Sequence, residues 1–161
     1  MRRRGKNIFE KERLRPSQMR TVADRRFGDA DALFITGDNA RANGAIYLAG
    51  IGVECLLKAR LIEKHLWLQN ANRQDKPPDS FLYRLCYQRH DLIGLLEHLP
   101  ELRDGLLKAG QKQGKGAGLL QTLVSVASRW TISIRYSPQT ATMHEAEQFM
   151  RKIGEVKPWL R

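Results

Sequence analysis

The segment of residues 42–62, ANGAIYLAGIGVECLLKARLI, decides the fold. Its first twelve residues, up to Val53, carry no charge and are small or apolar on every side. A helix of this composition belongs in the centre of a bundle, because each of its faces needs an apolar neighbour. Gly44, Gly50 and Gly52 each lower helix propensity by about 1 kcal/mol relative to alanine. We therefore expect neighbouring helices to approach this segment closely.

Helical periodicity extends from this segment in both directions along the chain. The predicted helices span about residues 17–34, 39–66, 91–107, 119–130 and 141–159. Pro100 should kink or split the third of them, since proline lacks a backbone N–H. Residues 69–80 and 109–118 are expected to be loops. The one β-flavoured stretch, 130–136, has no partner strand, so the sequence predicts an all-α, antiparallel four- to five-helix bundle.

Length and composition fit one soluble domain. The chain has 161 residues, of which 42 % are hydrophobic, and the expected domain covers 16–161. Its two cysteines, Cys55 and Cys86, lie among apolar neighbours and are expected to be packed, reduced thiols. No secretory signal follows the first residues, and Glu54 ends the longest uncharged run short of a membrane span. These features predict a cytoplasmic protein with no membrane association.

The net charge of +11 is concentrated at one end. Residues 1–15 contain seven basic and two acidic residues, and the basic ones include Arg2, Arg3, Arg4 and Lys6. A flexible basic arm of this kind is attracted to phosphate groups. It could equally serve as a solvated tail that aids solubility. Both interpretations remain open from charge alone.

Glu54 interrupts the most hydrophobic helix of the chain. A buried carboxylate must be paired or protonated, and Lys58, one helical turn further on, can reach it. One interpretation is a buried ion pair that fixes the register of the bundle. The other is that Glu54 and Lys58 contact a ligand.

A second unusual feature is Arg135 with Tyr136, between an apolar helix and the turn marked by Pro138. The forked guanidinium of an arginine can bind a phosphate or a carboxylate. Arg135 could instead anchor the turn by pairing with Glu54. The two roles are compatible.

Other familiar chemistries lack their motifs. The glycine- and lysine-rich segment 109–118 does not follow a strand and has no Gly-Lys-Ser/Thr ending, so it is not a phosphate-binding loop. The four histidines, His65, His90, His98 and His144, have no metal-ligand spacing with cysteine or carboxylate support. Neither cysteine has a matching histidine motif for thiol catalysis. We expect no metal and no cofactor.

Three stretches together resemble the HEPN domains (higher eukaryotes and prokaryotes nucleotide-binding). Residues 47–59, YLAGIGVECLLKA, resemble the family's central helix. Residues 90–96, HDLIGLL, resemble the start of its next helix, and 135–138, RYSP, resemble the element before its last helix. Their order and separation also agree, and the resemblance covers about residues 17–160. It implies an antiparallel helical bundle that is often a homodimer.

The resemblance also implies a choice between two functions. Many HEPN members are metal-independent ribonucleases with an arginine and a histidine four to six residues apart near the last helices. Here eight residues separate Arg135 from His144, which misses that spacing, and Arg60–His65 and Arg84–His90 match it only about as often as chance predicts. Other members bind RNA or nucleotides, or partner a small nucleotidyltransferase, as in toxin–antitoxin or defence systems. We expect such a non-catalytic module.

The alternative is a metal-independent endoribonuclease with a degenerate site. Arg135 would then stabilise the charged phosphorane-like state, and His144, or His90 from another helix, would transfer a proton. Proximity separates the two functions. A histidine beside Arg135 on one phosphate favours the enzyme, whereas Arg135 tied to Glu54, with every histidine remote, favours the binding module.

Overall fold

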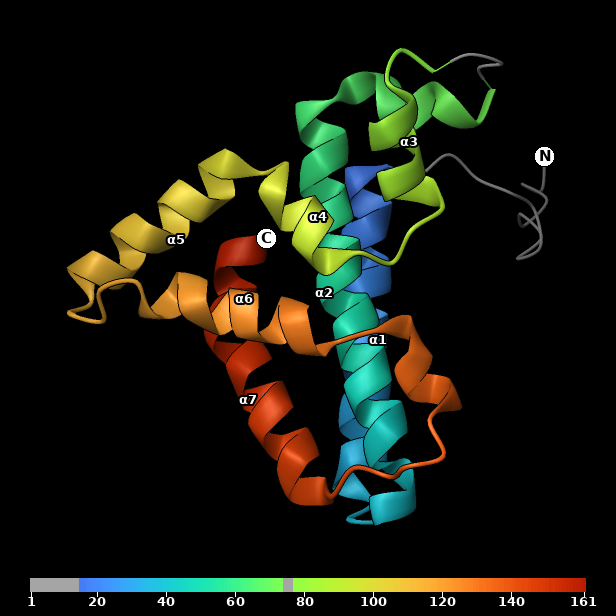
Figure 1. Cartoon of the computed structure of the whole chain (residues 1–161), viewed down its shortest axis with the longest axis vertical. Helices are drawn as coiled ribbons and strands as arrows, with labels where there is room; N and C mark the ends of the chain where they lie inside the picture. The colour runs from blue at the N-terminus through green and yellow to red at the C-terminus, as the bar shows by residue number, and fades with distance from the viewer. Residues whose placement is uncertain (1–14, 74–76) are drawn as a thin grey trace, which may run out of the picture.

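The computed structural model describes residues 15–73 and 77–161, and within these ranges it is all-helical with no strand (Figure 1). The predicted all-α class is confirmed. The basic arm with Arg2, Arg3, Arg4 and Lys6 lies outside the described residues. The α-helices are α1 (Pro16–Ile35), α2 (Ala42–Lys64), α3 (Ser80–Tyr87), α4 (Leu92–Glu97), α5 (Pro100–Lys112), α6 (Gly118–Arg129) and α7 (Met143–Leu160). The 3-10 helices are η1 (Asn39–Arg41), η2 (Leu66–Arg73) and η3 (Ile132–Tyr136).

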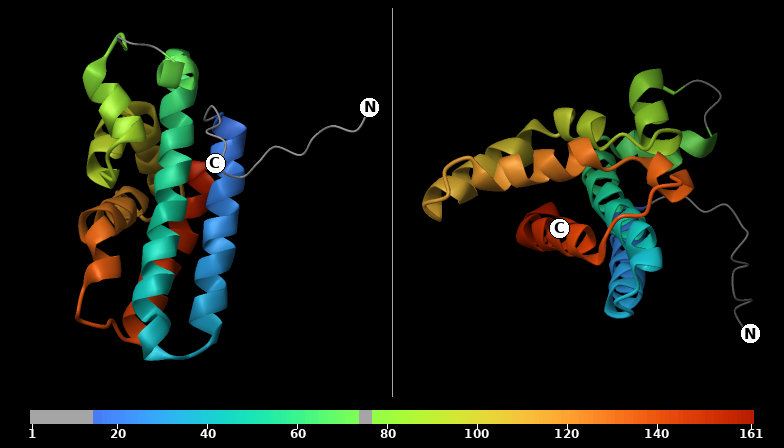
Figure 2. Two further views of the ribbon diagram at one scale, coloured as in Figure 1. Left: turned by 90° about the vertical axis from the view of Figure 1, so that its right-hand side faces the viewer. Right: turned by 60° about the horizontal axis from the view of Figure 1, so that its bottom comes forward.

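The α2 helix is the centre of the fold, as its composition predicts. It packs against α1, α7 and α4 and against η3, and its second half buries Leu56, Leu57, Leu61 and Ile62 completely. Figure 2 shows α1 and α2 side by side over most of their length, while α5 and α6 extend away from this pair. The central helix therefore presents a different partner on each of its faces.

The glycines of α2 mark close contacts between elements. A Cβ atom on Gly50 would lie 1.9 Å from Nε1 of Trp130, and one on Gly52 would lie 2.6 Å from the ring of Phe27. At Gly44 it would lie 2.9 Å from a leucine side chain of α1. Real Cβ contacts are longer than this, so a side chain at any of the three positions requires a neighbour to move. The expected close approach is confirmed.

The predicted count of four to five helices is wrong, because the described residues contain seven α-helices. The helix expected over 91–107 is split at Pro100, where α5 begins, because proline provides no backbone N–H. The α5 helix then continues to Lys112, so the loop expected at 109–118 is shorter. The α3 helix was not predicted. It is short, and it begins where the side chain of Asp79 accepts hydrogen bonds from two backbone N–H groups.

The end of the chain is tied to α2 by Arg60. Its guanidinium donates hydrogen bonds to the backbone carbonyls of Trp159, at 3.1 Å, and Leu160, at 3.2 Å. These carbonyls belong to the last turn of α7, where intrahelical partners run out. The Arg60–His65 spacing noted in the sequence therefore contains an arginine with a structural role. No helix in the described part of the chain is both long and apolar enough to cross a membrane.

Candidate functional site

The three stretches that resemble HEPN domains meet along one face of α2. Positions 47, 50, 54 and 58 follow one another at intervals of three or four residues and therefore lie on the same side of the helix. The loop before α4 brings His90 to Glu54, and η3 brings Arg135 to Tyr47. In Figure 1 this loop and η3 both lie beside α2. Residues distant in sequence are thus collected along one face of α2.

Glu54 and Lys58 form a buried ion pair. The Lys58 Nζ lies 2.5 Å from a carboxylate oxygen of Glu54, and the two side chains are 8 % and 5 % exposed. The ammonium also donates a hydrogen bond of 3.1 Å to the carbonyl of Arg89. The predicted pairing of residues one turn apart is confirmed. The hydrogen bond from Lys58 to Arg89 ties α2 to the loop that carries His90.

His90 contacts the Glu54–Lys58 pair from its solvent-facing side. Its Nδ1 lies 2.9 Å and 3.1 Å from the two carboxylate oxygens of Glu54, while its side chain remains 44 % exposed. When Nδ1 carries the proton and donates a hydrogen bond to Glu54, Nε2 is left as a proton acceptor. The carboxylate therefore orients an accessible imidazole. The next residue, Asp91, holds the loop in place because its side chain accepts a hydrogen bond from the Gly94 N–H and caps α4.

Arg135 lies in a second cluster, with two tyrosines. Its guanidinium donates hydrogen bonds to the hydroxyl of Tyr47, at 3.2 Å, and to that of Tyr136. It also lies over both rings, 5.7 Å from the Tyr47 centroid and 4.4 Å from the Tyr136 centroid. The hydroxyl of Tyr136, and next that of Tyr47, raise the pKa of Arg135. Both Arg135 and Tyr136 are exposed, and the tyrosine is 70 % so.

Pairing with Glu54, one of the two roles considered for Arg135, does not occur in the structure. Glu54 and Tyr47 are seven residues apart on α2, which is roughly 10 Å along the helix axis. Lys58 satisfies the carboxylate from the same helix, so no cation from η3 is needed there. Arg135 is consequently left without a carboxylate partner among the described residues.

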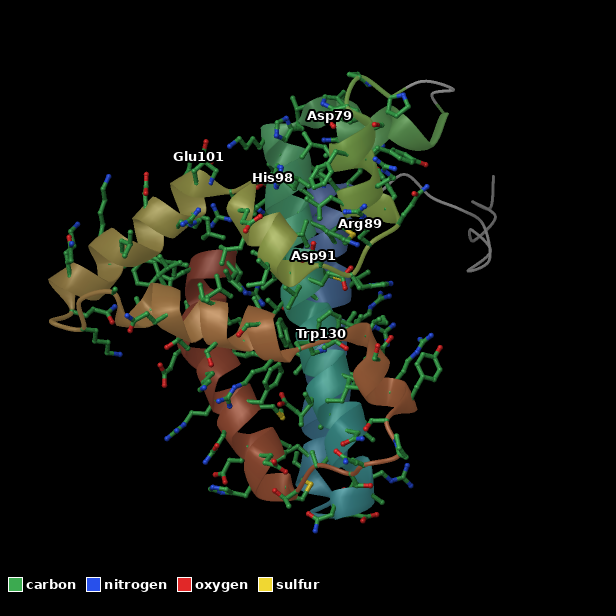
Figure 3. All side chains as sticks on the ribbon, in the orientation of Figure 1. Asp79, Arg89, Asp91, His98, Glu101 and Trp130 are labelled. Atoms are coloured by element: carbon green, nitrogen blue, oxygen red, sulfur yellow. The ribbon has the colours of Figure 1, made fainter. Side chains whose placement is uncertain are left out.

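Trp130 separates the two clusters and supports the second. It is buried against Gly50, its Nε1 donates a hydrogen bond of 3.3 Å to the carbonyl of Tyr47, and its ring stacks on that of Tyr47 with centroids 6.3 Å apart. Figure 3 shows Trp130, Asp91 and Arg89 following one another along α2. Trp130 thus supports Tyr47, and Tyr47 in turn holds Arg135.

The other histidine candidate lies elsewhere. His144 is in the first turn of α7, strongly exposed, with its ring 2.8 Å from the Gln148 amide nitrogen and 3.8 Å from a carboxylate oxygen of Glu147. Across the described ranges, Arg135 contacts neither His144 nor His90. The hydrogen-bonding partners of Arg135 are tyrosines, not histidines.

Sequence analysis missed a long stretch without acidic residues. Residues 105–144 contain no Asp or Glu, whereas they contain five basic residues. These five cations are exposed, and within the described part of the chain none pairs with a carboxylate. They are Lys108, Lys112, Lys115, Arg129 and Arg135. Counting charges in windows along the chain would have shown this stretch, which forms the second half of α5, α6 and η3.

The two thiols are structural. Cys55 and Cys86 are buried and free, and burial raises the pKa of each to about 11. Thiolates are therefore scarce at neutral pH, and neither cysteine is a ready nucleophile. No group of three metal-ligating side chains comes together within residues 15–73 and 77–161.

Known family models, curated proteins and solved structures were each compared with the chain, and none matches. Function is therefore inferred from the residues that the structure brings together.

Proposed function

We propose that this chain is a HEPN-like module that binds single-stranded RNA. The observation that carries the proposal is Arg135, an exposed guanidinium held against Tyr47 and Tyr136 with no carboxylate to neutralise it. An arginine already paired with an acid would have to break that pair before binding a phosphate. Arg135 can bind one directly, in a forked geometry.

The exposed ring of Tyr136 adds a second kind of contact. Unpaired bases stack on aromatic side chains and on arginine planes, which contributes about 1–3 kcal/mol per base. A base within a duplex is already stacked on its neighbours, so this surface favours single strands. Arg135 and Tyr136 together therefore offer a phosphate contact beside a base contact.

The acid-free stretch adds further exposed cations to the chain. Lys108, Lys112, Lys115 and Arg129 carry charges that no described carboxylate neutralises. Such cations attract the RNA backbone without reading its sequence, and the affinity they supply falls as salt displaces them from the phosphates. The expected binding is salt-dependent and of low sequence specificity.

Two further features belong to the proposal through the resemblance. HEPN-like modules are often homodimers, and some partner a small nucleotidyltransferase in cytoplasmic toxin–antitoxin or defence systems. Support comes from the meeting of residues 47–59, 90–96 and 135–138 along one face of α2. These stretches are distant in sequence, so their convergence is consistent with a shared fold.

RNA titration tests the proposal. The full chain is titrated into a labelled 12-nucleotide single-stranded RNA at 50 mM and 200 mM salt, and fluorescence anisotropy gives the affinity. We expect Arg135→Ala and Tyr136→Ala each to weaken binding about tenfold, since each removes a charged hydrogen bond or a stacking surface. Arg135→Lys should fall between, because it keeps the charge and loses the fork.

Arg25→Ala is the matched control, since it removes an exposed cation from α1. It should change the affinity by less than about threefold. Equal affinities for the wild type and Arg135→Ala, or binding that does not respond to salt, would contradict the proposal.

A second function has one observation in its favour. Glu54 orients His90, and an imidazole positioned by a carboxylate is a common general base or acid in RNA cleavage. If the chain is an endoribonuclease, incubation with cellular RNA in EDTA should give fragments that His90→Ala abolishes and His144→Ala leaves unchanged. Cleavage by His90→Ala at the wild-type rate would exclude His90 as the proton-transfer group.

A further inference from the structure

A pocket of about 200 Å³ lies on the α2–η3 junction, beside the Arg135 cluster. Ile46 and Ile134 line it, and each is the sequence neighbour of a residue of that cluster, Tyr47 and Arg135 respectively. Because consecutive residues of a helix point about 100° apart, the pocket opens on a different face of the junction. The other walls come from α6 and α7. The pocket is therefore a separate site built by four elements.

One side of the pocket is apolar. Ile46 and Ile134 face it together with Phe149 of α7, and both Ile46 and Phe149 belong to the hydrophobic core. This wall is held in place by core packing. It offers a firm surface to a ring or a compact hydrocarbon body.

Two cations from neighbouring helices also line the pocket. Ser125 and Arg129 are one turn apart on α6, and Lys152 reaches across from α7 to donate a hydrogen bond of 2.8 Å to the Ser125 hydroxyl. That hydroxyl is neutral and leaves the charge of Lys152 in place. The Arg129 side chain forms neither a hydrogen bond nor an ion pair with any of the described residues. Both cations are thus available to an anion in the pocket.

The pocket lining contains one acid, Glu145, whose carboxylate already accepts hydrogen bonds from Thr142. Its carboxylate accepts hydrogen bonds from the backbone N–H of Thr142, at 2.7 Å, and from the Thr142 hydroxyl, at 3.0 Å. These bonds cap α7 and hold the pKa of Glu145 below its usual range. Two cations against one capping carboxylate leave the lining with a net positive charge.

We propose that this pocket binds a small aromatic anion. The ring packs against Ile46, Ile134 and Phe149, and the acidic group lies between Arg129 and Lys152. A volume of about 200 Å³ suits one ring with one phosphate or carboxylate, since drug-sized ligands occupy pockets of about 300–1,000 Å³. This inference uses none of the residues of the Arg135 cluster. It shares Arg129 with the cations proposed to attract RNA, and it goes beyond the proposed RNA binding.

Phenyl phosphate and benzoate are suitable probes, because they share a ring and differ in the acid. Each is titrated into the full ¹⁵N-labelled chain at low salt and followed by NMR shifts. We expect at least one to bind saturably with a dissociation constant of about 1 mM or below. Inorganic phosphate and phenol should bind at least about tenfold more weakly, because inorganic phosphate lacks the ring and phenol lacks the acidic group.

Two kinds of variant locate the binding. Lys152→Gln and Arg129→Gln should each weaken it about tenfold by removing a charged hydrogen bond, while Arg151→Gln, an exposed neighbour on α7, should leave it unchanged. Ala141→Leu, which fills the pocket and keeps both cations, should abolish it. Ala141→Leu should also leave RNA affinity unchanged, which separates this site from the RNA surface. Circular dichroism confirms that the variants fold.

Three results would overturn the proposal. The first is no saturable shift with either probe up to about 10 mM. The second is unchanged affinity in both glutamine variants. The third is inorganic phosphate binding as tightly as phenyl phosphate, which would show that the apolar wall is not used.

Discussion

Replacing Glu54 by alanine is expected to destabilise the fold by about 3–5 kcal/mol, because the variant leaves the ammonium of Lys58 buried without its counter-charge. The Lys58 side chain is 8 % exposed, and its remaining partner is the carbonyl of Arg89. A loss of this size is a large share of the stability of an ordinary domain. Urea unfolding followed by circular dichroism measures it.

A double variant separates lost charge from lost packing. Glu54→Leu with Lys58→Met removes both charges at similar volume, so it should be far less destabilised than Glu54→Ala and could match the wild type. His90→Ala should cost only about 1 kcal/mol, because water can replace a half-exposed imidazole at the carboxylate. A double variant as unstable as Glu54→Ala would show that the ion pair is not the reason for the loss.

Local spacing predicted the parts of the site that lie within one element. Glu54 and Lys58 are one turn apart on a helix whose composition is evident from the sequence, and they pair as expected. The same helical reasoning predicted the close approach at Gly50. In each case a single helix and its periodicity hold all the required information.

Contacts between elements were not predictable in the same way. Which cation reaches Glu54 depends on where the loop before α4 and η3 cross α2, and that placement follows from the packing of the whole bundle. His90 was therefore considered only as a catalytic candidate. Pairing with Glu54 was one of two roles considered for Arg135, which lies at Tyr47 instead. The pocket lined by Ile46 and Lys152 has no sequence signature, because four elements build it.

Gly50→Ala is expected to destabilise the protein by about 2 kcal/mol, although alanine is the better helix former. The gain in helix propensity is about 1 kcal/mol. Against it, the new methyl group would lie 1.9 Å from Nε1 of Trp130, a ring that is buried and hydrogen-bonded to the carbonyl of Tyr47. Moving such a ring within a packed core should cost about 3 kcal/mol, the upper end of the usual range for overpacking. Urea unfolding gives the net effect.

Gly28→Ala is the matched control. Gly28 lies within α1, and a Cβ added there meets no atom within 4 Å. That variant should keep the gain in propensity and become up to about 1 kcal/mol more stable. If Gly50→Ala is stabilised to the same degree, Trp130 is not held as tightly as its contacts indicate.

The same substitution also tests whether packing supports recognition. Trp130 stacks on Tyr47, and Tyr47 holds Arg135, so a shift of the indole ring should loosen the guanidinium. We therefore expect Gly50→Ala to weaken single-stranded RNA binding below the wild-type and Gly28→Ala levels at temperatures where all three proteins are folded. Unchanged RNA affinity in a destabilised Gly50→Ala would mean that Arg135 is positioned by η3 alone.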